Sequence, residues 1–238
     1  MRIPFRPLLI LIVILFLPGI SENIFCSSPN SELKSGIQDT MLARQLLYNG
    51  RVWRNTTSKI EGDPYFLSRE FLNGSVTISG RSFENNYLLY DIYSDEVLIL
   101  SDKRSIINLN KELISGFTLD FNNQVYRFIR LKTDSLSEVD GFVNELYGGK
   151  SAVYVKYRKM IQIKAVDNIY DAFYQIYRVY IMKDGLPHQV KNRKQLLYLF
   201  QDEKQKIQDY LRSNRVKLSE KHPESFVPVA EFYDSLKK

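Results

Sequence analysis

Cysteine and histidine are scarce in this chain of 238 residues. Cys26 is the only cysteine, which excludes an intramolecular disulfide and a structural zinc site built on four thiolates. The two histidines leave little material for a histidine-rich metal site. Glycine, with 11 residues, and proline, with 8, are too rare for a collagen-like or low-complexity chain. We therefore expect no metal and no other cofactor.

The common catalytic motifs are missing as well. The sequence has no Gly-x-Ser-x-Gly elbow, no His-Glu-x-x-His zinc motif, no P-loop and no glycine fingerprint for a dinucleotide. His188 and His222 fit a surface turn and a helix-capping region better than a catalytic role. These absences favour a protein that is not an enzyme. A hydrolase built from carboxylates stays open, because Asp91, Asp95 and Glu96 cluster around one predicted turn.

Apolar residues, in contrast, are plentiful. Hydrophobic residues make up 44% of the chain and aromatic residues 13%, which excludes a disordered protein. The chain is long enough for one substantial core, and neither an internal repeat nor a linker divides it.

The N-terminus predicts a signal peptide over residues 1–21. Arg2 and Arg6 precede an unbroken apolar run over residues 8–17, which is too short to cross a bilayer. Small residues then favour cleavage between Ser21 and Glu22. Removal of residues 1–21 takes away two arginines and no acid, which lowers the formal net charge from +6 to +4. An uncleaved anchor is the alternative.

Residues 22–43 read as a polar leader that ends in a predicted short helix. Cys26 raises the alternative of a lipoprotein, because a lipidated cysteine follows soon after the apolar part of its signal. The bulky Phe25 argues against it, since that processing needs small residues before the cysteine. We expect membrane association only if Cys26 is lipidated.

Residues 44–191 predict an antiparallel β-rich core. Residues 117–121 alternate between apolar and polar, and Asn122 and Asn123 follow them. Asparagine tolerates the left-handed backbone that tight hairpin turns need, so this pair predicts a hairpin.

Two further hairpins are predicted in the second half of this core. Gly148 and Gly149 separate one pair of strands, and residues 183–185, Lys-Asp-Gly, separate the next. Pro187 cannot donate a ladder hydrogen bond, which places its strand at an edge of the sheet.

Residues 192–238 change to helical spacing. Asn192 with Gln195 resembles a capping box, Asp202 predicts the start of a second helix, and Pro223 the start of a last one. Strands followed by helices predict an α+β fold. We expect an antiparallel β-meander, as a curled sheet, a sandwich or a small barrel, followed by short C-terminal helices packed on the same domain.

One sheet face combines tyrosines with cations and is the predicted ligand-binding face. Such a face can stack on sugars or bases and contact anions, but it is also compatible with ordinary cross-strand pairs. The predicted export argues against nucleic acid. The face comprises Tyr154, Lys156, Arg158, Tyr174, Arg178 and Tyr180.

Residues 47–53, 74–80 and 90–93, together with the ending at 232–236, resemble a group of secreted proteins of Bacteroidetes-type bacteria that have no assigned activity. The resemblance implies export to the periplasm or to the periplasmic side of the outer membrane. It also implies O-glycosylation at Asp-Ser/Thr pairs that precede an apolar residue. The chain has three such candidate sites, at Ser135, Ser235 and Thr40.

Three functional hypotheses follow. The first is a non-enzymatic envelope protein that binds or scaffolds, with an envelope protein or a glycan as its partner. The second is a carrier of an apolar or carbohydrate ligand in a curled β-sheet. The third is the carboxylate-based hydrolase.

Overall fold

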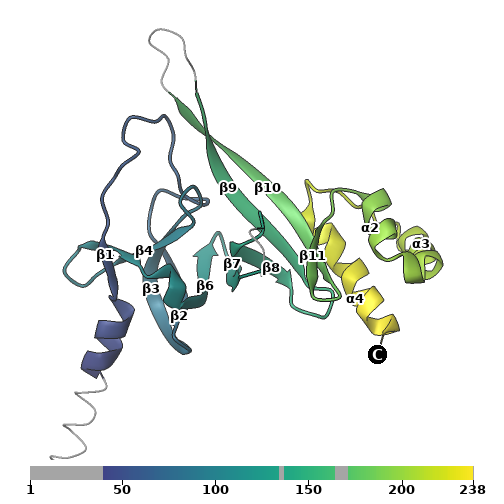
Figure 1. The fold of residues 1–238 in the computed structure, drawn as a ribbon, viewed down its shortest axis with the longest axis horizontal. Coiled ribbons are helices and arrows are strands. Elements are labelled where there is room, and N and C mark those ends of the chain that lie inside the picture. The colour runs from purple at the N-terminus through teal and green to yellow at the C-terminus, as the bar shows by residue number, and fades with distance from the viewer. Residues whose placement is uncertain (1–39, 134–136, 164–170, 238) are drawn as a thin grey trace, which may run out of the picture. The chain divides into compact units, whose positions relative to one another are not determined.

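The computed structural model describes residues 40–133, 137–163 and 171–237. The predicted signal peptide, Cys26 and Ser135 lie outside these ranges. The described residues form one antiparallel sheet of eleven strands, followed by short helices (Figure 1). The predicted α+β class is confirmed, and of the three predicted forms the sheet is the open, curled one. A helix also covers residues 40–47.

The first five strands form one half of the sheet, in the order β1-β5-β4-β3-β2. They are β1 (Gly50–Val52), β2 (Leu72–Ile78), β3 (Arg81–Asp91), β4 (Glu96–Leu100) and β5 (Ile106–Leu109). The 3-10 helix η1 (Lys111–Leu113) then leads the chain back, so that the next strand, β6, pairs with β2.

The second half is a continuous meander from that strand to the other edge of the sheet. Its strands are β6 (Ile114–Phe121), β7 (Gln124–Leu131), β8 (Gly141–Tyr147), β9 (Val153–Gln162), β10 (Ala172–Lys183) and β11 (Leu186–Gln189). The helical elements that follow are α2 (Arg193–Leu199), η2 (Gln201–Glu203), α3 (Lys204–Ser213), η3 (Pro223–Phe226) and α4 (Val227–Leu236).

The three predicted hairpins are confirmed. Asn122 and Asn123 both have positive φ, +51° and +61°, and join β6 to β7. Pro187 lies in β11, the strand at the edge of the sheet. The turn between β8 and β9 has a different reason for its glycine: a Cβ on Gly149 would overlap the hydroxyl of Tyr147.

The curl of the sheet brings the β3–β4 turn beside β9. The N–H of Lys159 donates to the carbonyl of Ile92 at 3.2 Å, and Lys159 Nζ lies 2.6 Å from the carboxylate of Asp63. Glu61 adds a parallel bridge to Ala172 at the start of β10. These contacts place the β3–β4 turn and β9, which are distant in the sequence, on either side of one cavity.

An aromatic cluster forms the core inside the curl. Phe117 stacks on Phe128 with ring centroids 4.8 Å apart, and Tyr90 meets both rings edge-on. Phe66, from the segment between β1 and β2, reaches the same cluster and contacts Phe128 at 5.2 Å. Aromatic rings bury large areas and prefer such tilted contacts, so this cluster dominates the packing of the sheet.

The helices pack on the start of β9 and on β10 through a second apolar cluster. Phe200 stacks on Tyr233 at 3.9 Å between centroids. Asn192 accepts the N–H of Gln195 as the predicted cap. Among the helices of the described ranges, none is both long and apolar enough to span a bilayer.

The predicted cap at Asp202 is wrong. The helix α3 begins at Lys204, and no side chain caps it. The carboxylate of Asp202 is taken by Lys183 at 3.0 Å, and by Tyr233 and Lys237 at 2.8 Å each. Three donors from other elements therefore compete with the helix for this side chain.

Phe128→Ala should lower the free energy of unfolding by about 3–5 kcal/mol, because it opens a cavity at the centre of the aromatic cluster. The neighbouring Val125→Ala is the control, since Val125 is exposed on the same strand. Its change should stay within about 0.5 kcal/mol. Urea denaturation measures both, and equal losses would contradict this description of the core.

Candidate functional site

The structure brings the six residues of the predicted ligand-binding face to one side of the β9–β10 hairpin. Paired residues of an antiparallel ladder share a face, and Tyr154 lies opposite Tyr180, while Lys156 lies opposite Arg178. Tyr174 lies opposite Met160. Alternation along β9 adds the remaining residue, Arg158, to the same face.

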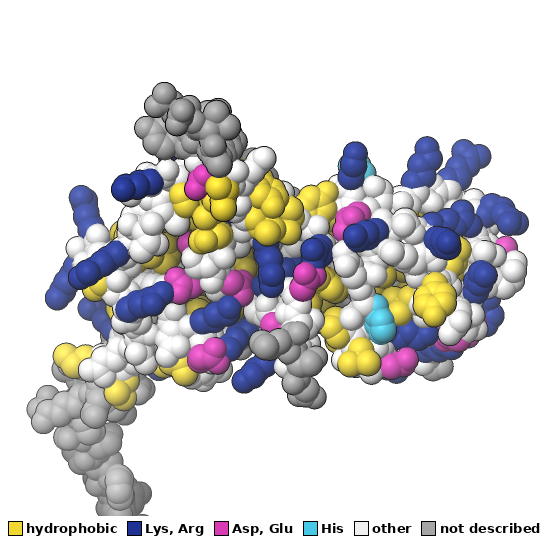
Figure 2. Space-filling model, turned by 45° about the horizontal axis from the view of Figure 1, so that its top comes forward, with side chains coloured by type: hydrophobic (Ala, Val, Ile, Leu, Met, Phe, Trp, Pro, Cys, Tyr) yellow, Lys and Arg dark blue, Asp and Glu magenta, His cyan; other side chains and the backbone are white. Residues whose placement is uncertain are grey.

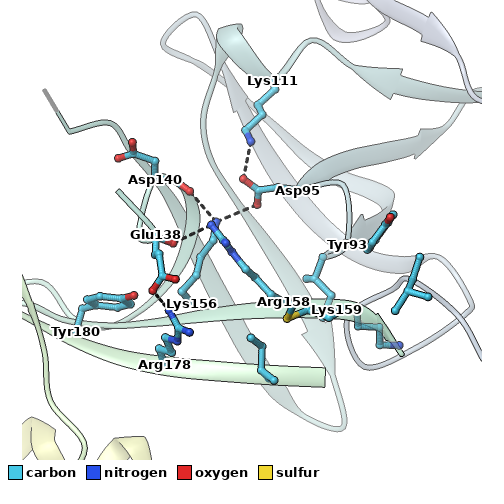
Figure 3. A pocket seen from close by; sticks show the side chains of 14 residues that line it. Tyr93, Asp95, Lys111, Glu138, Asp140, Lys156, Arg158, Lys159, Arg178 and Tyr180 are labelled. Atoms are coloured by element: carbon cyan, nitrogen blue, oxygen red, sulfur yellow. Dashed lines mark hydrogen bonds and ion pairs between the residues drawn. The ribbon is translucent and has the colours of Figure 1, made fainter. Parts of the chain in front are cut away.

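Four of the six residues line a cavity of about 590 Å³ (Figure 3). These are Lys156, Arg158, Arg178 and Tyr180. Tyr154 is buried in a small apolar cluster beside Tyr180, and Tyr174 is exposed nearer to the hairpin tip. The predicted face is therefore one continuous surface, but only its middle part forms a cavity.

The opposite wall comes from elements that sequence reasoning did not connect with this face. The β3–β4 turn supplies Tyr93 and Asp95, η1 supplies Lys111, and the segment before β8 supplies Glu138 and Asp140. Only Asp95 was singled out in the sequence, and for a different role. No local pattern marks the others, because the curl of the sheet is what brings them together.

The lining of the cavity is strongly charged. Of its fourteen residues, five are cations and three are carboxylates. The rest are two tyrosines, Tyr93 and Tyr180, and four aliphatic residues. Cations therefore exceed carboxylates in a space that also offers apolar surface.

The carboxylate of Asp95 organises one end of the cavity. It accepts hydrogen bonds from Tyr90 at 2.5 Å, Lys111 at 2.5 Å and Lys156 at 3.2 Å, and from the N–H of Phe142 at 3.4 Å. Burial alone would raise the pKa of this carboxyl, but Lys156 and the donors around it outweigh burial and lower the pKa. The carboxylate of Asp95 is therefore ionised, and its oxygens accept hydrogen bonds from the protein itself.

Lys156 is held in place by three acceptors. Its Nζ donates to Asp95 and, at 3.0 Å each, to the carbonyls of Asp140 and Phe142. An ammonium group has three N–H donors, so none is left for a ligand. Burial lowers the pKa of Lys156 to about 8, although Asp95 opposes the shift. Lys156 thus supports the cavity wall and is not free to contact a ligand.

Gly141 makes this close packing possible. Its φ is +98°, a conformation that side chains rarely adopt. A Cβ at this position would also overlap the carboxylate of Asp95 and come within 2.9 Å of Lys156 Nζ. The position therefore requires glycine for two independent reasons.

Arg158 and Arg178 of the β9–β10 hairpin both contact Glu138. Arg178 forms an ion pair with the carboxylate of Glu138, and Arg158 donates to the backbone carbonyl of Glu138 at 2.9 Å (Figure 3). Within the described residues, Arg158 has no carboxylate partner. Both arginines are half-buried, which strengthens their attraction for an anion.

The three carboxylates considered for a hydrolase do not share one cavity. Asp95 lines the cavity described above, whereas Asp91 and Glu96 line a separate cavity of about 310 Å³. Asp91 accepts the N–H groups of Tyr93 and Ser94 and closes the β3–β4 turn. Burial nevertheless raises its pKa.

Glu96 is also engaged, by Arg51 and Asn108 at 2.5 Å each. All three carboxylates thus serve contacts within the fold. In the ranges that the structure describes, no group of three or more His, Cys, Asp or Glu residues could hold a metal ion.

The candidate glycosylation sites differ in their surroundings. Thr40 lies at the start of the described residues, in a helix, and Ser235 is exposed on α4. The carboxylate of Asp234 is buried, where it accepts from Tyr147 and Ser151. An enzyme that reads the Asp-Ser pair at 234–235 would therefore need access before the chain folds.

Comparisons of this chain with protein-family models, with curated proteins and with solved structures found no match.

Lys156→Met tests the buried cation through the pH dependence of stability. The pKa of Lys156 is about 8 in the folded protein, against 10.5 for an ordinary lysine. Between these values the unfolded chain binds more protons, so this residue makes stability rise with pH, by up to about 1 kcal/mol per pH unit. The unfolding free energy of the wild type, minus that of the variant, should therefore increase above about pH 8.

Urea denaturation at several pH values measures this difference. Lys150→Met is the matched control, because Lys150 is exposed beside the β8–β9 turn. Its difference from the wild type should stay flat over the same range. A flat difference for Lys156→Met as well would contradict the buried position of its ammonium group.

Proposed function

We propose that the chain is a non-enzymatic, exported protein of the bacterial cell envelope that binds an anionic saccharide in the β9–β10 cavity. The observation that carries this proposal is the pair of half-buried arginines, Arg158 and Arg178, bridged by Glu138. Arginine binds carboxylate, phosphate and sulfate groups through its planar fork of donors. The internal glutamate marks where such a group would bind.

The other lining residues fit the rest of a sugar. A cavity of about 590 Å³ lies in the range of about 300–1,000 Å³ that small ligands occupy. Tyr93 and Met160, which are both exposed, provide apolar surface for the face of a ring. A purely apolar ligand fits less well, because more than half of the lining residues are charged.

The carboxylates of the cavity favour binding over hydrolysis. Asp95 accepts from four donors, Glu138 pairs with Arg178, and Asp140 accepts from Thr133 and Ser137. A general acid or base needs a free position toward its substrate. We therefore rank the hydrolase below the binding protein.

The envelope location rests on the signal-like N-terminus and on the resemblance to secreted proteins of Bacteroidetes-type bacteria. In this proposal residues 1–21 are removed and the cavity faces the periplasm or the outer membrane. The saccharide would then be a component of the envelope or of material that reaches it.

The protein recovered from its native envelope should have the intact mass of residues 22–238, because small residues precede Glu22 as the processing enzyme requires. Mass spectrometry measures this directly. A mass that begins at Cys26 and includes acyl chains would overturn the prediction of a soluble exported form. Extra glycan mass would support modification at the Asp-Ser/Thr pairs.

Binding of digalacturonate, measured by titration calorimetry, tests the proposed ligand class. Arg158→Gln and Arg178→Gln should each weaken binding by about 10- to 100-fold, since a hydrogen bond to a charged group contributes about 1.5–3 kcal/mol. Glu138→Gln should tighten binding, because it removes the carboxylate that competes for Arg178.

The control is Arg127→Gln, which breaks a pair with Glu145 on an exposed arginine away from the cavity. Its affinity should equal that of the wild type. Neutral galactobiose should bind much more weakly than digalacturonate. Equal affinities for the two sugars, or weaker binding by Glu138→Gln, would refute the role of the arginine pair.

A further inference from the structure

The positive charge of the chain is concentrated at its C-terminal end. Residues 22–190 contain twenty Lys and Arg and twenty Asp and Glu, and are therefore neutral. Residues 191–238 contain eleven Lys and Arg against seven Asp and Glu. The formal net charge of +4 that remains without residues 1–21 thus belongs to residues 191–238, which we call the helical layer.

Two carboxylates of this layer connect it to the sheet. Asp202 binds Lys183 and Lys237, and Asp234 accepts from Tyr147 and Ser151. Asp234 is buried, whereas Asp202, Asp209, Glu224 and Glu231 are exposed. The formal excess of four positive charges is counted with these exposed carboxylates included.

Seven exposed cations of the layer have no carboxylate partner within the described part of the chain. They precede α2, lie on α2 and α3, or follow α3. They are Lys191, Arg193, Lys194, Lys204, Arg215, Lys217 and Lys221. Cations without partners keep their full attraction for an external anion.

These cations are spread over several sides of the layer. Arg193 and Lys194 are adjacent on α2, and a helix turns about 100° per residue, so they point to different sides of the helix. Figure 2 shows Lys and Arg side chains projecting upward and outward from the helical end of the molecule. A flat surface would meet only some of them.

We propose that the helical layer binds a strand of an acidic polysaccharide, as a linear polyanion that bends around several sides of the layer. A flexible chain reaches cations that a membrane plane would not. Single-stranded nucleic acid would need aromatic platforms for its bases. Among the described helical residues, Tyr198 is the one large aromatic side chain that is strongly exposed. This inference does not depend on the cavity.

The test measures binding of the full chain to polygalacturonate by fluorescence anisotropy at several salt concentrations. A triple variant exchanges unpaired cations of the layer for glutamine, and a control exchanges three exposed lysines elsewhere, so both lose the same charge. The first is Lys194→Gln, Lys217→Gln and Lys221→Gln. The control is Lys59→Gln, Lys103→Gln and Lys150→Gln.

The first variant should lose about tenfold in affinity at low salt, and the slope of log affinity against log salt should decrease by about 2, since each neutralised charge contributes roughly 0.7. The control should bind as the wild type does, and neutral dextran should not bind. Circular dichroism confirms that both variants fold.

Three outcomes would overturn the inference. Equal losses in both triple variants would mean that only net charge matters. Tighter binding to phosphatidylglycerol vesicles than to polygalacturonate would assign the layer to a membrane surface. Tighter binding to single-stranded DNA would assign it to nucleic acid.

Discussion

The buried carboxylate of Asp95 is the constraint on which the candidate site depends. It ties together β3 through Tyr90, η1 through Lys111, β9 through Lys156, and the start of β8 through the backbone of Phe142. Burying a carboxylate is costly unless cations and donors surround it, and here two lysines and two further donors do so. The elements that form one end of the cavity are thereby fixed relative to one another.

This constraint divides the charges of the cavity into two kinds. Lys111 and Lys156 form ion pairs with Asp95, so they shape the cavity without contacting a ligand. Arg158 and Arg178 instead contact the exposed Glu138. In the helical layer, seven exposed cations have no carboxylate partner within the described residues. In the function that we propose, ligand binding therefore depends on Arg158 and Arg178.

Local patterns in the sequence predict local features of this fold. Asn122 and Asn123 predict a tight hairpin because their side chains tolerate positive φ, and the alternation in β9 and β10 places the predicted residues on one face. The return of β6 to β2 and the curl that joins Lys159 to Ile92 depend on contacts between distant residues. No periodicity encodes them.

The site follows the same division between local and distant information. Alternation shows which face Lys156 and Tyr154 occupy, but the depth of each on that face depends on what packs above it. The opposite wall, with Asp95, Lys111 and Glu138, comes from three separate segments, so no pattern within one segment predicts it. Asp202 illustrates the converse: its local capping signal is overridden by Lys183, Tyr233 and Lys237.

The most direct test of the central claim is a crystal structure of the chain grown with digalacturonate. The account predicts a ligand carboxylate between Arg158 and Arg178, with the side chain of Glu138 displaced from Arg178. A cavity that stays empty at saturating ligand, with Glu138 still paired to Arg178, would contradict it.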